Sequence, residues 1–75
     1  MEEMLFKGIA QTDDGTVHFE VWATENEDNL DEEIVGIYED EFGLIDTEIF
    51  PKNEDLDCVV QWVLDFYNYE VEIQA

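Results

Sequence analysis

The chain has 75 residues, of which 22 are Asp or Glu and only two are Lys or Arg, so its formal net charge at pH 7 is −20. Such a surface repels nucleic acid and anionic membranes, which argues against direct binding to either. Its hydrophobic fraction of 45% is ordinary and periodically arranged, which predicts one folded domain over residues 1–75 and not a disordered acidic chain.

Two alternating segments near the N-terminus predict a β-hairpin. The first strand is expected over Met4–Thr12 and the second over Thr16–Thr24, joined by the turn sequence Asp13-Asp14-Gly15. Alternation in the second strand sorts its side chains into two sets. One set should face the core (Val17, Phe19, Val21, Ala23), and the other should face away from it (His18, Glu20, Trp22, Thr24).

The acidic stretch Glu25–Gly43 predicts an amphipathic helix. Asn29 and Glu32 approximate a capping box, and apolar residues then recur at helical spacing up to Gly43, which suits the position after a helix end. Gly36 in the middle and three acids at the C-terminal end oppose a helix. The alternative is a strand over Ile34–Tyr38 that turns through Glu39–Gly43 into the next strand.

The C-terminal half predicts a strand, a helix and a final strand. Leu44–Phe50 alternates and ends at Pro51, and Asn53 is the expected N-cap of the following helix. Tyr69–Ile73 alternates again. The expected core stripe of the helix has five members (Leu56, Val59, Val60, Val63, Tyr67), and a second stripe lies beside it (Cys58, Trp62, Phe66).

These elements follow one another in the order β-β-α-β-α-β. The expected fold is therefore a small α+β domain, with an antiparallel or mixed sheet and two helices packed on one of its faces. The segments join without a linker, repeat or low-complexity tail.

No arrangement of residues in the sequence predicts an enzyme, a cofactor site or a metal site. His18 lies on an outer strand face, where histidine is usually an ordinary surface residue. Cys58 has acidic neighbours, which raise a thiol pKa and weaken it as a nucleophile. The carboxylates lack the fixed ligand spacing of a calcium-binding EF-hand loop.

The same features predict a cytoplasmic location. A single cysteine excludes an internal disulfide, as is usual in reducing compartments. No apolar run approaches the roughly 20 residues of a membrane span, and the acidic start MEEMLF is unlike a signal peptide.

The acidic residues themselves are the candidate functional site. Almost no cations are present to neutralise these carboxylates, so they create a strong negative electrostatic field around the protein. Such a field would attract a basic protein surface. On a helix, carboxylates three or four residues apart lie about 5–6 Å from one another, close to the spacing of phosphates in a nucleic-acid strand. The predicted row comprises Glu25, Glu27, Asp28, Asp31, Glu32, Glu39, Asp40 and Glu41, extended by Asp13 and Asp14 at the hairpin tip, with Trp22 as an apolar anchor.

In size, acidity and absence of a catalytic motif, the chain resembles the small acidic inhibitors made by phages and mobile elements. That class includes uracil-DNA glycosylase inhibitors, anti-restriction proteins and many anti-CRISPR proteins. The resemblance lies in composition over the whole chain and not in a shared motif. It implies an inhibitor that mimics the charge of nucleic acid and blocks the nucleic-acid-binding surface of a host nuclease or repair enzyme.

Two other functions fit the composition. A halophilic cytoplasmic protein would also be rich in acids, although this chain contains more Ile, Phe and Tyr than halophile adaptation favours. An acidic adaptor or subunit could use Trp22 and the outward strand face around His18 and Glu20 to contact a basic partner.

Screening of charge should stabilise the fold, because repulsion among so many carboxylates opposes compaction. We expect the urea midpoint of unfolding to rise as NaCl increases from about 0.05 to about 1 M, and also at mildly acidic pH. Urea titrations followed by circular dichroism measure both effects. A midpoint that stays constant across the salt series would contradict unscreened repulsion.

Overall fold

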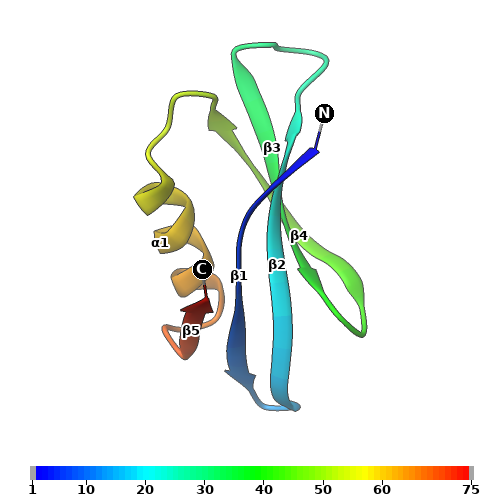
Figure 1. Cartoon of the computed structure of the whole chain (residues 1–75), viewed down its shortest axis with the longest axis vertical. Helices are drawn as coiled ribbons and strands as arrows, with labels where there is room; N and C mark the ends of the chain where they lie inside the picture. Colours follow the sequence, from blue (N-terminus) through cyan, green and yellow to red (C-terminus); the bar gives the residue numbers. More distant parts are fainter. Residues whose placement is uncertain (1, 75) are drawn as a thin grey trace.

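Five strands in the order β4-β3-β2-β1-β5 form one antiparallel sheet in the computed structural model, which describes residues 2–74. The first four strands follow one another as a meander, and the fifth returns beside β1 after a helix (Figure 1). The elements are β1 (Glu2–Thr12), β2 (Gly15–Glu25), β3 (Glu32–Glu39), β4 (Gly43–Pro51), α1 (Leu56–Phe66) and β5 (Val71–Gln74).

The predicted α+β fold with two helices on one face of the sheet is therefore wrong. Residues 2–74 contain a single short helix, α1, and the protein is nearly all-β. The error lies in one segment, because the predicted helix in Glu25–Gly43 is a loop followed by strand β3. The alternative strand over Ile34–Tyr38 is the correct one, and Gly43 does adopt a positive φ of 73°, but at the start of β4, directly after the β3–β4 turn.

Burial explains why Glu32–Glu39 forms a strand. β3 lies between β2 and β4, so it is hydrogen-bonded on both sides, and Val35 and Ile37 are completely buried. β-branched residues suit a strand packed on one or both faces better than a helix. Gly36 lies opposite Trp22, and a Cβ added to it would come within 2.9 Å of the Leu44 side chain. The glycine that weakened the helix prediction thus gives room to neighbouring side chains.

The residues taken for a capping box form consecutive turns instead. Asn29 Oδ1 accepts a hydrogen bond from the Asp31 amide at 3.1 Å, and Asn29 Nδ2 donates to Glu32 Oε1 at 3.1 Å. Just before it, buried Asn26 accepts from the Asp28 amide at 3.1 Å. Asparagine side chains are common both in such turns and at helix N-caps, so the spacing of Asn29 and Glu32 is compatible with either a turn or a helix N-terminus.

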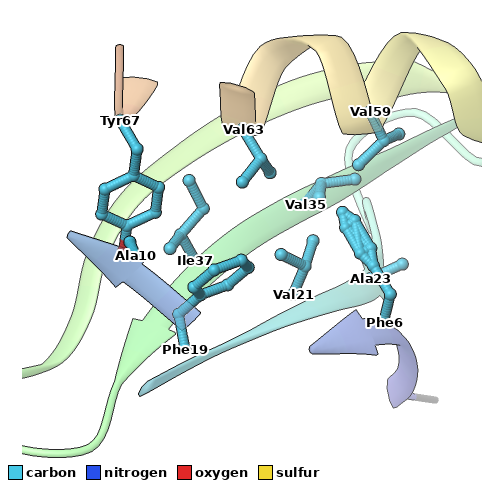
Figure 2. Close-up of a cluster of buried hydrophobic side chains, with 10 residues drawn as sticks. All are labelled: Phe6, Ala10, Phe19, Val21, Ala23, Val35, Ile37, Val59, Val63 and Tyr67. Atoms are coloured by element: carbon cyan, nitrogen blue, oxygen red, sulfur yellow. The ribbon is translucent and has the colours of Figure 1, made fainter. Parts of the chain in front are cut away.

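The core lies between the sheet and α1, on what we call the core face. Ten hydrophobic residues of the described range 2–74 are buried there, among them Phe19, Val21 and Ala23, which were expected to face inward. Figure 2 shows Val59 and Val63 of α1 pointing towards the strand residues, with Tyr67 beyond the end of the helix. Burying a Val, Ile or Phe side chain completely stabilises the fold by roughly 1.5–3 kcal/mol, before the loss of conformational entropy is subtracted.

The opposite side of the sheet, which we call the open face, has no covering layer in residues 2–74, because their only helix packs on the core face. A β-bulge between Met4 and Phe6 shifts the pairing by one residue, so that Met4 pairs with Trp22 and is exposed while Phe6 is buried. Leu44 and Ile49 are also exposed on this side, opposite Tyr38 and Ile34 of β3.

The C-terminal elements start later than predicted. The N-cap of α1 is Asp55 rather than Asn53, and no side chain caps it. Leu56 and Phe66 are exposed, so the buried stripe is narrower than expected. After α1, Asn68 and Tyr69 take positive φ values of 58° and 66°, and this turn delays the final strand until Val71.

Gly8 offers a test of how β5 docks on β1. A Cβ at this position would lie 2.5 Å from the Glu72 carbonyl oxygen and 2.7 Å from Phe19 Cζ. We expect Gly8→Ala to destabilise the protein by about 1–3 kcal/mol, because the backbone of β5 must move away. Gln11→Ala, at an exposed position of the same strand, serves as the control in urea unfolding. Equal midpoints for the two variants would contradict the close approach.

Candidate functional site

The meander divides the predicted row of acids between the two ends of an elongated molecule, whose principal extents are 37, 22 and 19 Å (Figure 1). Turns β1–β2 and β3–β4 lie at one end, which we call the tip end, and the β2–β3 loop lies at the other, the loop end. The tip end holds Asp13, Asp14, Glu39, Asp40 and Glu41, and the loop end holds Glu25, Glu27, Asp28, Asp31 and Glu32. The even carboxylate spacing expected from a helix is absent.

One lysine lies at the loop end. Glu25 stands directly opposite Glu33 across β2 and β3, an unfavourable pair of like charges. Lys52 Nζ lies 3.3 Å from Glu25 Oε1 and relieves this repulsion, although both side chains are substantially exposed. Exposed ion pairs contribute at most about 1 kcal/mol. The loop end therefore has one partly compensated acid among several uncompensated ones.

The tip end has a cleft of about 640 Å³ between the two turns and the end of α1. Its lining includes five carboxylates, and no lysine is among the lining residues. Sequence reasoning missed one of these acids, Glu70, and all three aromatic residues. The carboxylates are Asp13, Asp14, Glu39, Glu41 and Glu70, and the aromatic residues are Phe42, Phe66 and Tyr67. The cleft combines negative charge with apolar surface.

A hydrogen bond between Tyr67 and Glu39 holds the wall of this cleft together. The buried Tyr67 hydroxyl donates to Glu39 Oε2 at 2.7 Å and thereby ties the end of α1 to the end of β3. The pKa of Tyr67 is raised well above its ordinary value, first because burial disfavours the phenolate, and then because Glu39 accepts a hydrogen bond from the hydroxyl and its charge repels a phenolate.

Trp22 lies on the open face, three residues before Glu25 of the loop end and farther from the tip end. Its Nε1 donates to Glu20 Oε1 at 2.9 Å, so the indole is fixed along β2. Around it are Met4, which pairs with Trp22, and Gly36, over which the side chains of Tyr38 and Leu44 approach. The proposed anchor therefore belongs to a wider apolar surface. Alternation in the sequence places Thr47 and Ile49 on this face, but Leu44 joins them only through the register shift between Ile37 and Tyr38, which no local pattern signals.

The two residues considered for catalysis remain separate. His18 is exposed on β2 opposite Ile9, and the nearby Glu20 is bonded to Trp22. Cys58 Sγ donates to Glu54 Oε1 at 3.1 Å. This hydrogen bond, slight desolvation and the neighbouring carboxylates raise the pKa of the exposed thiol, which keeps it protonated at neutral pH.

Comparison with models of protein families, with curated proteins and with solved structures finds no match. Within residues 2–74, no three His, Cys, Asp or Glu side chains are grouped so that they could hold a metal ion. No helix in the same part of the chain is long and apolar enough to cross a membrane.

The bond between Tyr67 and Glu39 predicts a loss of stability at alkaline pH. Tyrosine in the unfolded chain ionises near pH 10, whereas folded Tyr67 keeps its proton because its pKa is raised. Its contribution is therefore complete below about pH 10 and declines as the pH rises further, by up to about 1.4 kcal/mol per pH unit.

Urea unfolding of wild type and Tyr67→Phe between about pH 8 and 11 measures this effect. We expect the variant to be less stable by about 1–2 kcal/mol at pH 8, where Glu39 loses its donor, and the difference to shrink as the pH rises. A constant difference across the series would show that the Tyr67 proton does not contribute.

Proposed function

We propose that this protein is a stoichiometric inhibitor that mimics the charge of nucleic acid and occupies the basic nucleic-acid-binding surface of another protein. The target would be a nuclease or repair enzyme of a host defence system, as for anti-restriction or anti-CRISPR inhibitors, met in the cytoplasm of the host cell. No catalytic step is required, since occupying the surface is itself the activity.

The density of charge along the molecule is the observation that carries this proposal. A net charge of −20 over a long axis of 37 Å amounts to about one negative charge per 1.9 Å. Duplex DNA carries about one charge per 1.7 Å of its axis. A basic groove that accepts DNA would therefore meet a similar number of negative charges along this protein, and binding would release counterions in the same way.

Mimicry of nucleic-acid charge does not require a helical row of carboxylates. The acids concentrate at two ends separated along the long axis, and the turns that carry them are held by hydrogen bonds such as those of Asn26 and Asn29. Fixed turns lower the entropy lost on binding. The match with nucleic acid is thus one of total charge and length and not of regular phosphate spacing.

The open face favours one other candidate function, that of an acidic subunit or adaptor. Exposed Leu44 and Ile49, near half-buried Trp22, give an apolar surface that charge mimicry alone does not need. Such a subunit would bind a basic partner and leave the partner's nucleic-acid binding intact. The two functions therefore differ in one measurable respect.

Competition with DNA tests the proposal. Proteins captured from a bacterial lysate at low salt and eluted at high salt are purified and mixed with a labelled DNA duplex. We expect one equivalent of this protein to displace the duplex, with an affinity that falls steeply as salt increases. A captured protein that keeps its full DNA affinity in the presence of excess acidic protein would overturn inhibition and favour the subunit.

Three triple variants locate the effect. Each removes three negative charges: Asp13→Asn/Asp14→Asn/Glu41→Gln at the tip end, Glu27→Gln/Asp28→Asn/Asp31→Asn at the loop end, and Glu20→Gln/Asp57→Asn/Glu72→Gln between the ends as the control. We expect each end variant to weaken binding about tenfold more than the control, since three surface ion pairs at about 0.5 kcal/mol each are lost. Equal losses in all three would contradict binding through the ends.

A further inference from the structure

β4 leaves one edge of the sheet unpaired. It has nine residues, and among residues 2–74 only β3 hydrogen-bonds to it. Leu44 and Ile49 are each about half exposed along this strand. Unpaired edges of this length are templates on which a further strand can add, so proteins usually protect them.

The outward backbone groups of this edge can be identified. The Thr47 amide donates to Asp46 Oδ1 at 2.9 Å, and the Ile49 amide donates to Glu48 Oε1 at 3.3 Å. These amides are two residues apart, as outward N–H groups of a strand must be. Pro51, which has no N–H, comes next in the same series and is tolerated there because an outward position needs no donor to the sheet.

Charge and polarity also alternate along the edge. Asp46 and Glu48 pair with Ile37 and Val35 and so lie on the core-face side, whereas Thr47 and Ile49 lie on the open-face side. A strand added here would place its own side chains beside these two sets. Lys or Arg of the added strand would pair favourably with the carboxylates on the core-face side. Apolar residues of that strand would pack against Ile49 and Leu44 on the open-face side.

We propose that the free edge of β4 binds an extended segment of a basic protein in which Lys or Arg alternates with apolar residues. In this complex the outward amides of Thr47 and Ile49 donate to carbonyl oxygens of the added strand. Asp46 and Glu48, released from those amides, accept hydrogen bonds from the basic side chains. Every group exchanges one partner for another, so no polar group is left unsatisfied.

Repulsion between like charges disfavours a second copy of this chain at the same edge. In an antiparallel pair centred on Thr47, Asp46 of each copy would lie opposite Glu48 of the other, and like charges directly opposite destabilise a sheet. Each copy also brings a net charge of −20. The carboxylates that attract a basic strand therefore prevent pairing of the protein with itself.

This inference rests on the proposed function in one respect, namely that the partner is basic, and it names a contact that the partner would make. Its test uses neither DNA nor the captured enzyme. The probe is the capped peptide Lys-Val-Lys-Val-Lys-Val-Lys-Val-Lys, compared with a peptide of the same composition in which the five Lys precede the four Val. Only the alternating peptide can present Lys and Val on opposite faces of a strand.

NMR titration of the protein with each peptide follows the backbone amides. We expect the alternating peptide to shift the signals of Thr47 and Ile49, slow their hydrogen exchange and bind about tenfold more tightly than the block peptide. Thr47→Pro, which removes one outward amide, should weaken that preference, whereas Thr47→Ala, which keeps this amide and the Ile49 side chain, should retain it. Both variants keep every charge of the two acidic ends.

Circular dichroism verifies that the proline variant folds, and the exchange rates of the wild type decide the matter if it does not. Equal binding of the two peptides, or unchanged exchange at Thr47 and Ile49, would overturn strand addition while leaving competition with DNA untouched. Conversely, protected amides together with a failure to displace DNA would support strand addition and overturn the nucleic-acid mimic.

Discussion

The shortage of cations constrains every part of this structure. Two lysines face 22 acids, and one lysine is used at the loop end beside Glu25. Charge pairing therefore cannot hold the fold together. The fold is stabilised instead by the ten hydrophobic residues within 2–74 that are buried between α1 and the sheet. A core this small leaves little net stability, so solvation must limit the repulsion among the acids. Most of the acids are exposed, and those on the central strands, such as Glu20 and Glu33, are only half-buried.

This constraint also explains why the molecule is a sheet rather than a helical domain. A helix over Glu25–Gly43 would have crowded its acids onto one surface at intervals of about 5–6 Å. In the meander, the same residues separate into two ends of a molecule 37 Å long, while Val35 and Ile37 fill the core between them. Extended strands thus reduce repulsion and increase burial at the same time.

Much of the fold follows from local sequence. Alternation and the Asp-Asp-Gly turn predict the first hairpin correctly, and the predicted strand Leu44–Phe50 and the helix after it are close to the observed elements. The β3 segment failed because its apolar residues fit both a helical repeat and a buried strand, and only its pairing with β2 and β4 decides between them. The β-branched run around Gly36 was the better guide.

The candidate site was less predictable than the fold, because it depends on topology. That Glu70 and Phe66 join Asp13 and Glu39 in one cleft follows from the return of β5 beside β1, which no local pattern reveals. The edge of β4 is a similar case. Whether a strand lies at an edge depends on the order of all strands in the sheet, which its own sequence does not reveal. Its alternating acids nevertheless have a double consequence. Under the proposed strand addition, they would keep copies of an exposed, partly apolar edge apart and leave that edge open to a strand of opposite charge, so the same residues would oppose aggregation and select a basic partner.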